Sequence, residues 1–303
     1  MKNGQVGTAI DEFFGRYKNT LSLLEEFLIS KSNRQEFVLL TCARLDSLAN
    51  LAFAEGTQKS RFSRFLARYS GLGKRTFAIS VPDLYYYFQH YSWIVDSSVP
   101  EPGRIVLFRE RDKEFAQFIF DSGIPVTKVH VRSLLTSMMG AFKHNFRVSP
   151  SQNTTMKTCA TTDEIVEIIR ESVRQKAGHS QPSGAQTNIG AIVSAYTVGT
   201  LLYRRYRSGA IHEWGVKLDE EDFFHTDSVY WKKTPVHSHQ FLKIQFPAIF
   251  LLNLLKQSID AYKRELRETE KLPYGVWSNG GLSEEFLDAR SILPDTPAKI
   301  AVR

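Results

Sequence analysis

Apolar residues recur every three or four positions along residues 10–95, and this spacing constrains the fold more than any other feature of the sequence. An α-helix returns a side chain to the same face about every 3.6 residues, so residues 10–27 and 37–54 predict helices packed as a hairpin. Residues 60–70 predict a further helix with arginines on one face, and Pro82 suits the first turn of the next. The sequence therefore predicts a mainly α fold, a helical bundle.

The second half of the chain continues this pattern. Residues 189–207 predict a buried helix that its neighbours approach closely, because they are apolar nearly all round until Tyr203 and contain many small residues. Residues 215–233 carry acids and aromatics that suit a short exposed β-hairpin, and residues 241–266 predict a long closing helix. Gly, Pro and Ser recur after Lys271, so we expect a partly mobile tail over residues 271–303.

Residues 99–162 are the hardest part of the chain to interpret. Residues 103–111 and 125–135 alternate polar and apolar side chains, which favours short strands, although either segment also suits the start of a helix. Thr162 or Asp163 is then expected to cap the next helix, and a linker containing Gly, Pro and Ser follows that helix.

The charges are unevenly distributed, although the formal net charge is only +7. Residues 56–82, 122–162 and 172–212 contain bases but no acid. Such blocks favour an anionic partner, and nucleic acid is the commonest large one. The alternative is that the bases form solvated helix faces. In the first block, the candidate RNA contacts are Arg61, Arg64, Arg68, Lys74 and Arg75.

Composition excludes several other classes of protein. Cys42 and Cys159 are too few for a disulfide framework or a four-cysteine zinc site, and we expect no metal or other cofactor. The N-terminus has no apolar signal-peptide core. The longest apolar stretch, residues 246–255, has about half the residues that a membrane span needs. We therefore expect a cytoplasmic protein with no membrane partner.

The candidate for catalysis is Arg207 with His212, separated by four residues. The spacing alone is weak, because roughly two Arg–His pairs with four to six intervening residues are expected by chance. The chain also contains Arg205 with His212, and Arg174 with His179. We discount the pair Arg174–His179, because it runs from a helix into the linker, where nothing would hold either side chain.

Arg207 and His212 are about 140° apart on an ideal helix, so a straight helix would not bring them together. Ser208-Gly209 offers a place for the helix to deform, and the alternative is that two copies of the segment meet across a dimer axis. Without metal ligands, Arg and His suit RNA cleavage: the imidazole accepts the 2′-hydroxyl proton while the guanidinium binds the phosphate. Alternatively, His212 caps the helix C-terminus and Arg207 pairs with a carboxylate such as Asp46.

The order of these segments resembles the HEPN superfamily. The resemblance is carried by FVLLTCARLDSLANLAF, SRFSRFL and the distant LYRRYRSGAIHEW, followed by a hairpin and a long helix. It covers residues 34–70 and 186–266, and implies one HEPN-like domain with core segments 1–98 and 186–270 and an insertion at 99–162. It also implies a helical bundle, usually dimeric, whose paired Arg-x4-6-His motifs form a metal-independent endoribonuclease site at the subunit interface.

Carried onto this chain, the resemblance implies that Arg207 and His212 are catalytic, and we expect support from Ser208, Asp46, Arg204 and Arg205. Many members have Asn, Asp or His where this chain has Ser208, and some toxin-type members have Tyr where it has Trp214. The expected function is cleavage of single-stranded RNA by a homodimer, in toxin or phage defence, with a possible regulatory partner protein. The alternative is a catalytically silent HEPN module that binds RNA or a partner protein.

Overall fold

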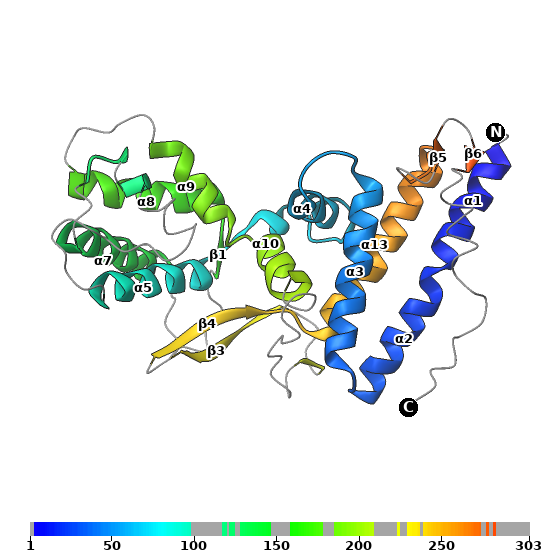
Figure 1. The fold of residues 1–303 in the computed structure, drawn as a ribbon, viewed down its shortest axis with the longest axis horizontal. Helices are drawn as coiled ribbons and strands as arrows, with labels where there is room; N and C mark the ends of the chain where they lie inside the picture. The colour runs from blue at the N-terminus through cyan, green and yellow to red at the C-terminus, as the bar shows by residue number, and fades with distance from the viewer. Residues whose placement is uncertain are drawn as a thin grey trace, which may run out of the picture. The chain divides into compact units, whose positions relative to one another are not determined.

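The computed structural model describes residues 3–97, 117–119, 121–124, 128–146, 158–177, 185–208, 223–224, 229–236, 239–273, 277–278 and 281–282. This part of the chain is mainly helical (Figure 1), which confirms the expected fold class. It also contains three two-stranded antiparallel sheets. The chain forms two compact units, which we call the terminal unit (residues 1–71 and 252–303) and the central unit (residues 72–251).

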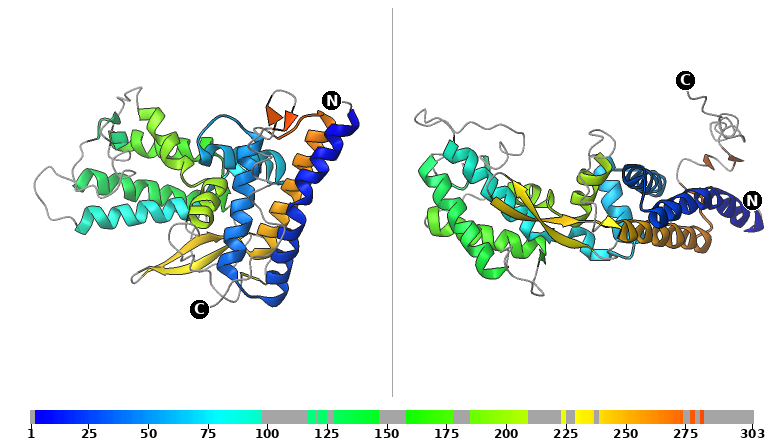
Figure 2. Two further views of the ribbon diagram at one scale, coloured as in Figure 1. Left: turned by 45° about the vertical axis from the view of Figure 1, so that its right-hand side comes forward. Right: turned by 90° about the horizontal axis from the view of Figure 1, so that it is seen from below.

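Helices from both ends of the chain build the terminal unit (Figure 2). They are α1 (Asn3–Gly15), α2 (Tyr17–Ser30), α3 (Arg34–Ala52), α4 (Gln58–Tyr69) and most of α13 (Ala248–Glu268). The short strands β5 (Trp277–Ser278) and β6 (Gly281–Leu282) follow α13. The helices expected near residues 37–54 and 60–70 are therefore confirmed, whereas the one expected over residues 10–27 is divided at Arg16 into α1 and α2.

Large aromatic and aliphatic side chains fill the core of the terminal unit. Leu24, Phe37 and Phe62 are fully buried. The ring of Phe65 meets the ring of Tyr262 edge to face, with 5.9 Å between their centroids. Because Tyr262 lies on α13, this contact joins the C-terminal helix to the N-terminal ones.

The central unit has two parts in chain order. Its N-terminal part is η1 (Gly73–Phe77), β1 (Ile79–Ser80), α5 (Val81–Ser97), α7 (Lys128–Asn145), β2 (Cys159–Ala160) and α8 (Thr162–Ala177). Its C-terminal part is α9 (Ala185–Ser194), α10 (Val198–Leu202), η2 (Tyr203–Ser208), β3 (Tyr230–Val236) and β4 (His239–Gln245). Neighbouring helices pack in the order α5, α7, α8 and α9.

Of the two alternatives for residues 125–135, the strand is wrong from residue 128 onwards and the helix start is confirmed, because helix α7 begins there. Val131, Leu134, Leu135 and Met138 are fully buried and lie at helical spacing, so packing against α5 and α8 decides the structure. The strand expected over residues 103–111 lies outside the described residues.

The helix expected over residues 189–207 is interrupted between α9 and α10. The N–H of Ser80 donates to the carbonyl of Tyr196 (2.9 Å), and the N–H of Val198 donates to the carbonyl of Ala78 (2.9 Å). The chain around β1 therefore takes up backbone groups that a continuous helix would pair internally. Thr197 then begins α10, because its hydroxyl accepts from the N–H of Thr200 (3.2 Å).

Other boundaries also shift. The cap of α8 is Thr161 rather than Thr162 or Asp163, since the hydroxyl of Thr161 accepts from the N–H of Glu164 (3.2 Å). A hairpin after Trp214 is present, but it is β3–β4, and the closing helix begins only at Ala248. No described helix has the length and apolar character needed to cross a membrane.

The expected single domain stays a prediction, although the insertion at residues 99–162 contributes directly to the central unit. Helix α7, from this range, packs between α5 and α8, and β2 pairs with β1. Within the expected tail, residues 271–273, β5 and β6 are described.

Candidate functional site

The candidate catalytic segment begins in the central unit, where α10 continues directly into η2. The residues of α10 are buried. From Tyr203 to Ser208 the winding widens into a π-helix. We expected a deformation at Ser208-Gly209, and the described change begins earlier, at Tyr203. Such turns are rare, and they occur frequently at functional sites.

Arg205 anchors η2 to two other elements. Its Nη1 donates to the carbonyl oxygen of Ile244 on β4 (2.9 Å), and its Nη2 forms an ion pair with Oδ1 of Asp83 on α5. The side chain of Arg205 is 30% exposed, whereas that of Asp83 is 1% exposed. The predicted supporting residue Arg205 therefore has a structural role in joining α5, η2 and β4.

Asp83 is the centre of this network. Its Oδ2 accepts from the hydroxyl of Ser80 (2.5 Å) and from the N–H of Ile244 (3.1 Å). The Ser80 hydroxyl in turn accepts from the indole Nε1 of Trp231 on β3 (3.0 Å). The N–H of Ile244 thus donates to Asp83, and its carbonyl oxygen accepts from Arg205. At this residue, the backbone groups of β4 are therefore hydrogen-bonded to side chains of α5 and η2.

The next residue of η2 is also fixed. Tyr206 is buried, and its hydroxyl oxygen accepts from the N–H of Phe246 (3.0 Å). Its ring meets that of Phe246 edge to face, with 5.2 Å between the centroids. Two successive residues therefore hold the turn immediately before Arg207.

The predicted catalytic pair is described only in part. The backbones of Arg207 and Ser208 belong to η2, but nothing is described of their side chains, and His212 lies outside the described residues. Arg204 is half-buried in the same turn. Asp46 is buried on α3 in the terminal unit. The convergence of these residues stays a prediction.

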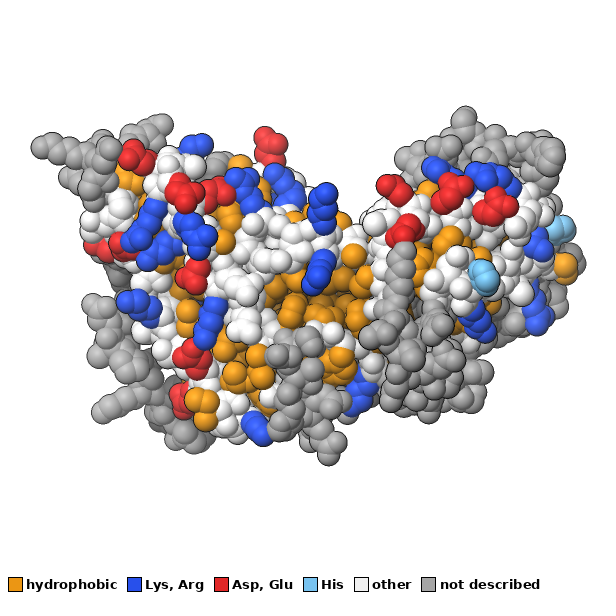
Figure 3. Space-filling model, turned by 180° about the vertical axis from the view of Figure 1, so that it is seen from behind, with side chains coloured by type: hydrophobic (Ala, Val, Ile, Leu, Met, Phe, Trp, Pro, Cys, Tyr) orange, Lys and Arg blue, Asp and Glu red, His pale blue; other side chains and the backbone are white. Residues whose placement is uncertain are grey.

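Two arginines of the expected RNA-binding face of α4 have partners within the terminal unit. Nε and Nη2 of Arg68 donate to the two carboxylate oxygens of Glu265, each at 2.8 Å. The guanidinium of Arg64 lies 4.3 Å from the centroid of the Phe53 ring. Arg61 is half-buried, while Lys74 and Arg75 are exposed on η1 in the central unit. Acidic and basic side chains are accordingly intermixed on the face shown in Figure 3.

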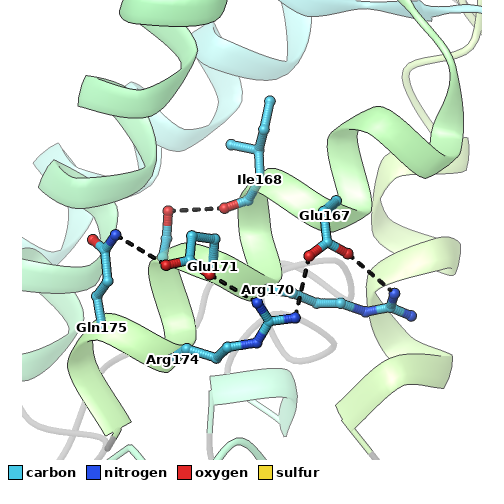
Figure 4. A network of polar contacts seen from close by, with 7 residues as sticks. Glu167, Ile168, Arg170, Glu171, Arg174 and Gln175 are labelled. Atoms are coloured by element: carbon cyan, nitrogen blue, oxygen red, sulfur yellow. Dashed lines mark hydrogen bonds and ion pairs between the residues drawn. The ribbon is translucent and has the colours of Figure 1, made fainter.

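Arg174, from the discounted Arg–His pair, has partners on its own helix (Figure 4). It forms ion pairs with Glu171 (2.8 Å) and Glu167 (3.1 Å), and Glu167 also lies 3.6 Å from Arg170. The expectation that nothing would hold Arg174 is wrong, because α8 supplies two carboxylates. This network gives Arg174 a structural role, and His179 lies outside the described residues.

Lys243, on β4, lies beside Tyr86 and Arg205, although its sequence context predicts no such role. Its ammonium lies 4.8 Å from the centroid of the Tyr86 ring. Burial, and secondarily Arg205, lower the pKa of Lys243, whereas Asp83 acts in the opposite direction. The sequence does contain a pattern that points to Asp83. Ser80 and Asp83 form a Ser-x-x-Asp pattern before an apolar run, which is typical of a helix start. No such signal marks Lys243.

Other reactive groups have ordinary structural environments. Cys42 is buried, and burial and then Asp83 raise the pKa of the Cys159 thiol to about 11. Such a thiol is a poor nucleophile near neutral pH. Within the described ranges, no three His, Cys, Asp or Glu side chains gather as metal ligands would.

Comparisons of the chain with protein-family models, curated proteins and solved structures found no match.

Proposed function

We propose that this protein is a metal-independent endoribonuclease that cleaves single-stranded RNA, with His212 as the base and Arg207 on the phosphate. The proposal combines the HEPN-like motif with one structural observation. This observation is the anchored π-helical turn η2, in which Arg205 and Tyr206 are bonded to α5, β4 and Phe246. A rigid backbone immediately before Arg207 reduces the entropy lost when that side chain binds a phosphate.

The chemistry follows from the two side chains. The neutral imidazole of His212 takes the proton from a ribose 2′-hydroxyl, whose oxygen attacks the adjacent phosphorus and displaces the 5′-oxygen of the next nucleotide. The leaving 5′-oxygen takes a proton from the imidazolium or from water. The guanidinium of Arg207 binds the phosphate oxygens as their negative charge increases. The products carry a 2′,3′-cyclic phosphate and a 5′-hydroxyl, and DNA, which lacks the attacking hydroxyl, is not cleaved.

The test is incubation of end-labelled single-stranded RNA with the purified full chain in a metal chelator. We expect products with 2′,3′-cyclic phosphate ends. His212→Ala should abolish cleavage and keep RNA binding, while Arg207→Ala should weaken both. Arg174→Ala is the matched control, because Arg174 belongs to the same kind of Arg–His pair but forms ion pairs on α8. Cleavage by His212→Ala at the unmutated rate would show that His212 is not the base.

The same experiment separates the proposed enzyme from a silent HEPN module. If the protein binds RNA tightly but leaves it intact, the result would support a silent module that binds RNA. If the protein does not bind RNA at all, the remaining alternative is a silent module that binds a partner protein. The HEPN resemblance also suggests the biological role that we include in this proposal: the protein acts as a toxin or in phage defence, and a regulatory partner protein controls it.

The proposal includes a homodimer in which two copies of the Arg207–His212 segment share one site. Mixing His212→Ala with Arg207→Ala should then give more cleavage than either variant gives alone. In such a heterodimer, one subunit supplies His212 and the other supplies Arg207. If the mixed chains form heterodimers and cleave no faster than the separate variants, each site is made within a single chain.

A further inference from the structure

The short 3₁₀ turn η1 presents two cations and an aromatic ring to solvent. Lys74 and Arg75 are exposed, and Phe77 is 47% exposed, which makes it the one exposed large aromatic side chain among the described residues. Because a 3₁₀ helix has three residues per turn, Lys74 and Phe77 lie on the same side of η1. Thr76, on another side, is fully buried. The turn therefore directs one residue inward and the other three outward.

Hydrogen bonds on both sides of Phe77 hold its backbone in place. The N–H of Ala78 donates to the carbonyl of Arg75 (3.1 Å), and the carbonyl of Ala78 accepts from the N–H of Val198 on α10 (2.9 Å). Ile79 then enters the sheet of β1 and β2. A ring on a fixed turn loses little conformational entropy when a flat ligand packs against it.

The two cations of η1 have no ion-pair partner within the described residues. Arg75 acts electrostatically on the Cys159 thiol, but burial raises the pKa of that thiol to about 11, so the thiol carries no negative charge near neutral pH. Asp83 acts on the same thiol, yet its side chain is 1% exposed and pairs with Arg205. Lys74 and Arg75 can therefore bind an external anion.

This combination of side chains matches a nucleotide of a single strand. A single exposed ring is common on protein surfaces, so the combination with two cations is what indicates the ligand. Unpaired bases stack on aromatic rings, while lysine and arginine bind the phosphates beside them. A membrane surface fits less well, because Phe77 is the one large apolar side chain of η1, whereas interfacial sites present several.

We infer that η1 is a platform for single-stranded RNA, on which one base stacks against Phe77 while Lys74 and Arg75 bind the flanking phosphates. That the nucleic acid is RNA rests on the proposed function. Helix α10 packs against η1 and continues directly into η2, which contains Arg207. The platform is therefore linked through one short helix to the proposed catalytic segment, and it adds affinity for the strand that is cleaved.

The first experiment compares two single-stranded probes of equal length, both with 2′-O-methyl ribose, which prevents cleavage. One probe carries bases, and the other has the same sugar–phosphate chain without bases. Phe77→Ala should weaken binding of the probe with bases about tenfold, because stacking is lost, and should leave the abasic probe unaffected. Phe77→Trp, which keeps a stacking face, should bind both probes at least as tightly as the unmutated chain.

Val129→Ala is the matched control for Phe77→Ala. Val129 lies on α7 in the same unit and is 74% exposed, so this variant also truncates an exposed apolar side chain. It should change the affinity for neither probe.

The second experiment measures the salt dependence of binding for the two cations. Lys74→Met and Arg75→Met should each weaken both probes, because the abasic probe keeps its phosphates. Each should reduce the slope of log affinity against log salt by about 0.7, the value for one phosphate contact with a single strand. Phe77→Ala should leave this slope unchanged, because the ring contacts a base and no phosphate.

The outcomes separate the platform from the proposed catalysis. If Phe77→Ala weakens both probes equally, or Phe77→Trp binds as weakly as Phe77→Ala, the ring does not stack on a base and the platform is refuted. Failure of the unmutated chain to bind either probe also refutes it. If the variants behave as expected but unmodified RNA stays intact, only the proposed catalysis fails. If RNA is cleaved and Phe77→Ala binds normally, the proposed function stands without the platform.

Discussion

Asp83 is the residue whose loss should affect stability most. It is fully surrounded by donors, namely Arg205, the hydroxyl of Ser80 and the N–H of Ile244. An amide in its place cannot accept as many bonds or balance the charge of Arg205. We expect Asp83→Asn to lower the free energy of unfolding by about 2–4 kcal/mol, measured by urea denaturation.

The control for Asp83→Asn is Glu167→Gln on α8. Glu167 also pairs with arginines, but its side chain is 58% exposed, so solvent screens its ion pairs. Its loss should change stability little. Equal losses in the two variants would contradict the structural role of burial at Asp83.

Lys243 should make stability depend on pH. Its pKa is lowered in the folded chain, so the unfolded chain binds this proton more tightly, and the folded chain gains stability as the pH rises toward the ordinary lysine value. Lys243→Met removes the charge opposite Lys232 in the register of the hairpin and leaves an unbranched apolar side chain at this position. We expect a gain of about 0.5 kcal/mol at pH 7 that disappears near pH 10.5, measured by urea denaturation across this range. A constant difference would contradict the lowered pKa.

At the scale of elements, η2 depends on the hydroxyl of Tyr206. Tyr206→Phe leaves the N–H of Phe246 without this acceptor, which should cost about 1–2 kcal/mol in a thermal unfolding experiment. If η2 positions Arg207 as proposed, RNA cleavage should also slow. Tyr85→Phe, which keeps the ring beside Lys143, is the control and should change neither quantity. If Tyr206→Phe lowers stability but leaves the rate of RNA cleavage unchanged, the proposal that η2 positions Arg207 for catalysis is contradicted.

At the scale of the whole molecule, both chain ends are needed for the terminal unit. The ammonium of Lys256 on α13 lies 2.6 Å from Glu25 on α2, and Arg68 on α4 pairs with Glu265 on α13. A single cut between α8 and α9 should therefore leave two pieces that elute together in native size-exclusion chromatography and separate in denaturant. A stable fragment released under native conditions would instead favour independent domains divided near residue 180.

The helical segments could be predicted from the sequence because their apolar residues have one dominant period. Leu24, Phe37 and Phe62 are fully buried as that spacing required. The start of α7 could not be predicted with certainty from the sequence, because Val129 and Val131 alternate with polar residues over a stretch too short to distinguish a strand from a helix. The closing helix was predicted to start too early, because an apolar strand, β4, directly precedes it.

The sequence by itself determined the mainly helical class and the presence of an Arg–His motif near the end of a buried segment, because both depend on residues close together in the chain. Tertiary structure decided where α9 ends, since the chain around β1 supplies the partners for Tyr196 and Val198. It also decided that Arg205 anchors η2, because its partner Asp83 lies 122 positions away. Contacts between such distant residues have no local period, so only the folded chain brings Asp83, Arg205 and Lys243 together.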